Sequence, residues 1–167
     1  MTLGRQFEAY PHTAEGFVLV ENGNSNFASA RTKQNGLFAI DIINSFVIIA
    51  RDSEAQSAHM GVFELAGRDE EAYEDMMEEV KATMQGNIPI EFWIGGGAIK
   101  QNSASQNPLR QAAMEREKIV LRTAQHVPRS SIFTNWLEPG VRLDLVALDL
   151  RNQTLEFVEK NIQTESA

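Results

Sequence analysis

The sequence predicts an α+β domain, with mainly antiparallel sheets or a sandwich on which two main helices pack. Three observations support this. Short stretches rich in Ile and Val indicate strands, two long segments have helical periodicity, and strands and helices do not alternate strictly along the chain. A doubly wound α/β fold would require that alternation. With 167 residues, the chain is predicted to be a single domain, residues 1–167.

The first third of the chain is predicted to be rich in strands. Residues 1–15 are predicted as an irregular lead-in and residues 16–21 as a short strand. The Asn, Gly and Ser residues at 22–26 tolerate left-handed backbone and predict a turn. Residues 38–50 are rich in Ile and Val, which indicates one or two buried strands with a kink or turn at positions 44–45.

An acidic helix is predicted at residues 69–85, after a short strand within 57–65. Its apolar residues recur at helical spacing: Ala72, Met76, Met77, Val80 and Met84. Acidic residues crowd the first turn, where the helix dipole favours negative charge, and Gly86 is a natural C-terminal stop. The many acids of this segment indicate either a solvated surface or an acidic face for docking or oligomerisation.

A strand, a glycine motif and a second helix follow. Residues 88–94 are predicted as a strand, and the glycine motif at 95–98 follows it directly. Asn107 followed by proline indicates an N-cap and a first helical turn, so a helix is predicted from Asn107 to about Arg122. The β-branched residues at 118–123 leave a strand as the alternative there.

The C-terminal third is predicted to return to strands, at residues 131–133, 141–150 and 154–159. Alternation in the second of these predicts that one face carries Val141, Leu143, Leu145 and Ala147. Residues 149–154 are predicted to form the turn of a hairpin. The last residues, 161–167, are predicted to be frayed.

Composition excludes several classes of function. Fifteen basic and 23 acidic residues give a net charge of −8, which argues against general nucleic-acid binding and against adsorption to anionic membranes. Cysteine is absent, which excludes disulfides, thiolate metal sites and a cysteine nucleophile. We expect no metal, no cofactor and no membrane span, and we expect a cytoplasmic protein. The sequence does not specify the oligomeric state.

Two polar side chains are candidates for catalysis. His59 has small neighbours and could shuttle protons near neutral pH. Ser45 is the hydroxyl in the apolar stretch 37–50, and Asn44 beside it could stabilise an oxyanion. The spacing between Ser45 and His59 fits adjacent strands of a hairpin. A turn serine and a hydrogen-bonded structural histidine are the alternative interpretations.

The glycine motif has two interpretations as well. The bare backbone amides of Gly95, Gly96 and Gly97 could bind an anion or a carbonyl oxygen at the end of a strand. The same residues would allow close backbone packing. The motif is neither a dinucleotide fingerprint nor a P-loop.

Several short motifs occur in an order that resembles the CheD chemoreceptor glutamine deamidases. They are Asn44-Ser45-Phe46-Val47, Ser57-Ala58-His59-Met60, Gly95-Gly96-Gly97-Ala98, Asn107 and Gly140-Val141-Arg142, within residues 35–158. The resemblance implies, in this order, a nucleophile segment, a histidine segment, a glycine motif, a second helix and an arginine-bearing hairpin. Independently of the resemblance, the small neighbours of His59 and the glycine-rich strand end predict that His59 lies near Gly95–Ala98 in a shallow pocket, with Asn44 and the three glycines in its lining. If the pocket is a former deamidase site, the resemblance implies that Phe46 lines it.

One departure from the family changes the expected chemistry. Phe46 stands where the family carries its cysteine, and phenylalanine cannot form a thioester. The first hypothesis is therefore a non-catalytic, CheD-like domain that binds a protein partner or a small ligand. The alternatives are a hydrolase or deamidase-like amidase that uses Ser45 and His59, and a structural or assembly protein that uses the acidic helix at 69–85.

Overall fold

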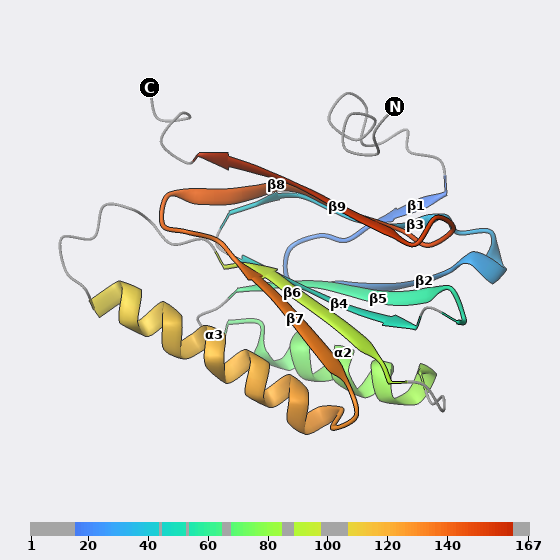
Figure 1. The fold of residues 1–167 in the computed structure, drawn as a ribbon, viewed down its shortest axis with the longest axis horizontal. Helices are drawn as coiled ribbons and strands as arrows, with labels where there is room; N and C mark the ends of the chain where they lie inside the picture. Colours follow the sequence, from blue (N-terminus) through green and yellow to red (C-terminus); the bar gives the residue numbers. More distant parts are fainter. Residues whose placement is uncertain are drawn as a thin grey trace.

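The fold has three layers (Figure 1). The computed structural model describes residues 16–43, 45–52, 54–64, 68–84, 89–97 and 107–161, with the backbone alone at 107–109. Over these residues the chain forms nine strands, two α-helices and one short 3-10 helix, η2 (Ala30–Thr32). A four-stranded sheet lies on a five-stranded sheet, and both helices cover the far face of the latter. The predicted α+β class is confirmed.

The four-stranded sheet, sheet A, has the order β1-β3-β8-β9 and takes its strands from both ends of the described chain. Its strands are β1 (Phe17–Leu19), β3 (Gly36–Ile42), β8 (Val141–Asp149) and β9 (Thr154–Asn161). The five-stranded sheet, sheet B, has the order β2-β5-β4-β6-β7. Its strands are β2 (Ser25–Ser29), β4 (Ser45–Asp52), β5 (Ser57–Glu64), β6 (Glu91–Gly96) and β7 (Ser131–Trp136).

Both sheets are mixed rather than purely antiparallel. The pairs β1–β3 and β6–β7 are parallel, and the other strand pairs are antiparallel. The helix α3 (Asn107–His126) connects β6 to β7, and parallel neighbours require a long crossover of this kind.

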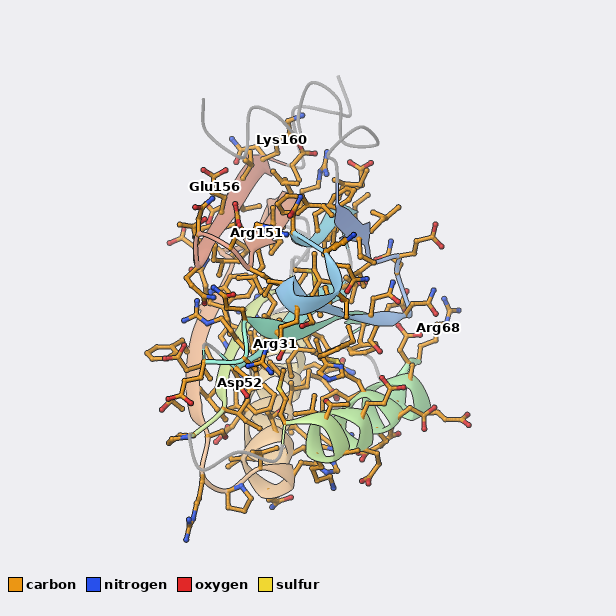
Figure 2. The ribbon with its side chains drawn as sticks, turned by 90° about the vertical axis from the view of Figure 1, so that its right-hand side faces the viewer. Arg31, Asp52, Arg68, Arg151, Glu156 and Lys160 are labelled. Carbon is orange, nitrogen blue, oxygen red and sulfur yellow. The ribbon has the colours of Figure 1, made fainter. Side chains whose placement is uncertain are left out.

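In the side view of Figure 2, Glu156 and Lys160 project from sheet A, whereas Asp52 and Arg31 lie at the level of sheet B.

The acidic helix is confirmed as α2 (Glu70–Thr83), which buries Tyr73, Met76, Met77 and Val80. The second helix extends to His126, so the alternative strand at 118–123 is wrong. Ile119 and Thr123 are both buried, one helical turn apart. Packing at that spacing outweighs the modest preference of β-branched residues for strands.

The first third of the chain contributes strands to both sheets. The apolar stretch 38–50 falls in two strands, β3 and β4, which belong to different sheets. The turn predicted at 22–26 is shorter than expected, because β2 begins at Ser25 and pairs with β5. Polar residues at the start of β2 gave no strand signal, and ladder pairing with β5 overrides their weak propensity.

Two apolar cores lie on the two faces of sheet B. Val47, Ile49 and Met60 belong to the core between the sheets, and Phe46 and Phe63 to the core under the helices. Side chains alternate between faces along a strand, so these memberships fix which way every residue of β4 and β5 points.

The predicted single apolar face of β8 is wrong. A register shift between Leu143 and Leu145 places Leu143 and Val146 in the core between the sheets. Leu145 and Ala147 lie instead in a separate apolar cluster with Phe38. An irregularity of this kind inserts a residue and moves the following side chains to the other face.

Candidate functional site

The predicted pair of Ser45 and His59 is not formed. In the ladder between β4 and β5, Ser45 lies opposite Glu64, and His59 lies opposite Ala50. The two residues are thus five positions apart along the strands, roughly 17 Å at the usual rise per strand residue. A serine nucleophile needs its base within hydrogen-bond reach, so this geometry excludes the predicted serine–histidine centre.

Ser45 and His59 also point to opposite faces of sheet B. Ser45 has the parity of Val47, which lies between the sheets. His59 has the parity of Phe63, which lies under the helices. Because the sheet separates them, no side-chain rotation can bring the hydroxyl to the imidazole.

His59 is a buried residue held by the end of α2. Its Nε2 lies 2.6 Å from Thr83 Oγ1, and Thr83 in turn donates its hydroxyl proton to the carbonyl of Glu79 at 2.8 Å. Since that proton is committed, His59 Nε2 must carry the hydrogen and donate to Thr83. The half-exposed ring of Phe27 packs over the imidazole, with the ring centroids 4.7 Å apart.

The environment of His59 keeps the imidazole neutral. Burial lowers its pKa from 6.5 to about 4. Its Nδ1 is buried and makes no hydrogen bond within the described residues. Glu79 Oε2 lies 4.0 Å from Nδ1, and the Glu79 side chain is largely exposed. The imidazole is therefore a structural contact between β5 and α2, which matches the alternative interpretation of His59.

Phe46 fills the position where the family would place its nucleophile. The side chain is buried, and its ring centroid lies 5.9 Å from that of Phe63 and 6.5 Å from that of Trp136. The cavity beside it, under α2 and α3, has a volume of about 40 Å³. That space is far smaller than an ordinary ligand pocket.

The predicted pocket brings Phe46 and the glycines together, but not His59. Phe46 lies opposite Gly96 in the β4–β6 ladder, and opposite Phe63 in the β4–β5 ladder. His59 is four residues from Phe63, roughly 13 Å along the same face. The prediction that His59 lies near the glycine end is therefore wrong. Asn44 lies outside the described residues.

The glycine motif has a structural role, in which its backbone groups form hydrogen bonds to neighbouring segments. Gly96 and Gly97 have φ values of 87° and 64°, which side chains rarely adopt. The amide of Gly97 donates to the carbonyl of Ser45 at 2.9 Å, and Leu137 donates to the carbonyl of Gly96 at 3.0 Å. Arg116 donates to the carbonyl of Gly97 at 2.5 Å. The Gly97 amide is thus engaged rather than aimed at a ligand.

The ring of Trp93 covers Gly95. A Cβ atom at Gly95 would lie 2.3 Å from Trp93 Cη2. Close packing therefore explains this glycine, as in the structural interpretation of the motif.

The acidic helix α2 is bound to the basic residues of α3. Arg122 forms ion pairs with Glu70, at 3.0 Å, and with Glu74. Its guanidinium also lies 5.1 Å from the ring centroid of Tyr73, and His126 lies 2.7 Å from Glu74. None of the exposed large apolar side chains among the described residues belongs to α2. Within the described residues, α2 therefore has no exposed apolar patch on which an oligomerisation partner could pack.

A second and larger cavity lies between the sheets, at the edge where β6 and β7 face β8 and β9. We call it the inter-sheet cleft. Its volume is about 240 Å³. It is lined by Ile49, Arg51, Glu91, Phe92, Trp93, Phe133, Leu148 and Leu155.

Aromatic side chains gather at the inter-sheet cleft. Trp93 on β6 and Phe157 on β9 meet across the two sheets, with ring centroids 5.8 Å apart. Phe133 on the edge strand β7 lines the cleft and is 58% exposed, and Phe157 is 41% exposed. Exposed aromatic groups that cluster at a cavity are typical of binding sites rather than of scattered surface residues.

An ion pair between Arg51 and Glu91 accompanies the apolar walls. The two residues lie opposite each other in the β4–β6 ladder, and Arg51 donates to the Glu91 carboxylate. By strand parity Arg51 shares the side of Ile49, and Glu91 shares the side of Trp93. Both charges therefore face the cleft, and their side chains are 27% and 42% exposed.

Sequence reasoning missed the inter-sheet cleft. Alternation along the predicted strand at 88–94 already places Glu91 and Trp93 on one face. Nothing in the sequence says, however, that β9 faces β6, because that depends on how the two sheets pack. The exposed Phe133 lies at the last position of a predicted strand, where its exposure had no sequence signal.

Comparisons with family models and with curated proteins were made for the chain. No family model matches the chain, and no curated protein matches it. Neither of the helices that the structure describes is long and apolar enough to cross a membrane. Within the same residues, no group of three His, Asp or Glu side chains could hold a metal ion. The resemblance to CheD deamidases thus rests on the sequence motifs.

Proposed function

We propose that this chain is a non-catalytic, CheD-like binding domain that holds a small, mainly apolar ligand in the inter-sheet cleft. The cleft carries the proposal, because it combines about 240 Å³ of space with aromatic walls and a pair of charges. Ligand sites in proteins are typically apolar clefts with a few polar groups. This volume is smaller than that of sites for drug-sized molecules, so it suits one ring or a compact bicyclic group.

Binding without catalysis is supported by the residues at the family-like positions. Phe46 cannot act as a nucleophile, and its ring occupies the space beside the glycine motif. His59 is neutral, buried and engaged by Thr83. A fold can persist after its chemistry is lost, because function depends on a few side chains. We therefore infer a CheD-like scaffold that has kept its architecture and lost deamidation.

Charge and composition support the remaining parts of the proposal. A net charge of −8 disfavours nucleic acid as a partner, since phosphate binding needs clustered Lys and Arg. The absence of cysteine suits a reducing compartment, and we propose that the protein acts in the cytoplasm.

Tryptophan fluorescence tests the cleft directly. The chain has two tryptophans, so the Trp136→Phe variant leaves Trp93 as the only indole. Titration with toluene, a neutral ring, should change the Trp93 emission in a saturable way. Burial of roughly 150 Å² of apolar ring at about 25 cal/mol per Å² gives about 4 kcal/mol, which corresponds to a Kd of about 1 mM.

Two substitutions on this background provide the control. Phe133→Ala removes one wall of the cleft and should weaken toluene binding roughly three- to tenfold. Phe27→Ala removes another half-exposed phenylalanine, which packs on His59 away from the cleft, and should leave binding unchanged. A flat emission curve, or equal effects of the two substitutions, would contradict the proposed site.

A further inference from the structure

The charges at the inter-sheet cleft come as a matched pair. Arg51 and Glu91 project from neighbouring strands at the same register position and line the same cavity as Trp93 and Phe133. Both side chains are partly exposed, so solvent screens their mutual attraction and little is lost when the pair opens. The ion pair can therefore open, and each of the two side chains can then bind a group of opposite charge on a ligand.

The pair discriminates between kinds of charged ligand. A ligand with a lone carboxylate would gain Arg51 but face repulsion from Glu91, and a lone ammonium would meet the opposite conflict. A ligand that carries an ammonium group and a carboxylate on the same carbon atom satisfies both residues at once and leaves the net charge of the site unchanged. Such electrostatic complementarity acts mainly on specificity.

The walls of the cleft define the rest of the ligand. Its sides are aromatic and aliphatic, from Trp93, Phe133 and Leu155, and its volume of about 240 Å³ suits a single ring. We infer that the ligand of the inter-sheet cleft is a free α-amino acid with an aromatic or large apolar side chain. Its carboxylate would bind Arg51, and its ammonium group Glu91. This inference rests on the proposed binding function.

Four probes that share one ring test the inference. They are L-phenylalanine, 3-phenylpropionate, phenethylamine and toluene, titrated at pH 7 into the full-length Trp136→Phe variant with Trp93 emission as the readout. L-Phenylalanine should bind at least tenfold more tightly than either singly charged analogue. Chemical-shift changes centred on the Trp93 indole N–H would confirm that all probes occupy the cleft.

Charge-removing variants provide a second test. Glu91→Gln should weaken L-phenylalanine about tenfold and strengthen 3-phenylpropionate, because Arg51 is then unopposed. Arg51→Gln should strengthen phenethylamine instead. Glu117→Gln, which removes an exposed acid from α3, should change none of these affinities.

The possible outcomes distinguish the amino-acid inference from the proposed binding of an apolar ligand in the inter-sheet cleft. If toluene binds but L-phenylalanine shows no advantage over its analogues, the amino-acid inference is overturned and the apolar site stands. If neither toluene nor any charged probe binds, both are overturned. An L-phenylalanine affinity that is unchanged by Glu91→Gln would also overturn the inference.

Discussion

Protonation of His59 should lower the free energy of unfolding, and the size of the loss follows from the lowered pKa of the buried imidazole. Burial lowers its pKa to about 4 in the folded chain, against 6.5 for an ordinary histidine. Below pH 6.5 the unfolded chain binds a proton that the folded chain does not. The contribution to stability is therefore complete above pH 6.5 and is lost as the pH falls towards 4. At pH 5 the loss is about 2 kcal/mol, from about 1.4 kcal/mol per pH unit.

Urea unfolding of the wild type and of His59→Gln measures this loss. Between pH 8 and pH 5 the wild type should lose about 2 kcal/mol more unfolding free energy than the variant. Acidic residues titrate in both proteins, so their contribution cancels in the difference. The same comparison in a His126→Gln background controls for the histidine between α2 and α3.

One result would refute the argument. If the wild type and His59→Gln show the same pH dependence, then His59 titrates alike in the folded and unfolded chains. The imidazole would then be accessible to water, and Thr83 and Phe27 would not cover it in solution.

Three further predictions concern the core and the glycine motif. Val80→Asp places a carboxylate in the fully buried core under α2 and should reduce the unfolding free energy by about 4 kcal/mol in urea titration; unchanged stability would mean that this face is exposed. Gly96→Ala should cost about 1–2 kcal/mol in the same assay, because φ is 87° and the new Cβ would lie 3.1 Å from the Ser45 carbonyl oxygen. Phe46→Cys should destabilise by about 3 kcal/mol and release no ammonia from glutaminyl peptides, since His59 is too far away to activate the thiol; ammonia release would restore the deamidase hypothesis.

Local patterns predicted most of the elements. Met76, Met77 and Val80 recur at helical spacing, and that periodicity directly reports which side of α2 is buried. The strand β2 was missed because Ser25 and Asn26 have little strand preference and pair only through the ladder with β5. The irregularity in β8 was also missed. The apolar residues alternate regularly through Leu143 and Leu145, so the sequence pattern does not show the register shift between them.

The candidate site was less predictable than the fold. A separation of 14 residues between Ser45 and His59 allowed a hairpin, and β4 and β5 do form one. Spacing alone does not fix the register, however, and a change of one residue reverses the face of every side chain. The inter-sheet cleft depends on contacts between Trp93 and Phe157, which are far apart in sequence and meet only when the sheets stack.

The origin of the strands in sheet A has a consequence for synthesis on the ribosome. Sheet B and both helices end at Trp136, whereas β8 and β9 are completed only at Asn161, roughly 25 residues later. At about 5–20 residues per second, the nascent chain spends roughly one to five seconds with the inner face of sheet B only partly covered. During that interval Val47, Ile49 and Met60 form an apolar surface on which a chaperone can act before sheet A closes.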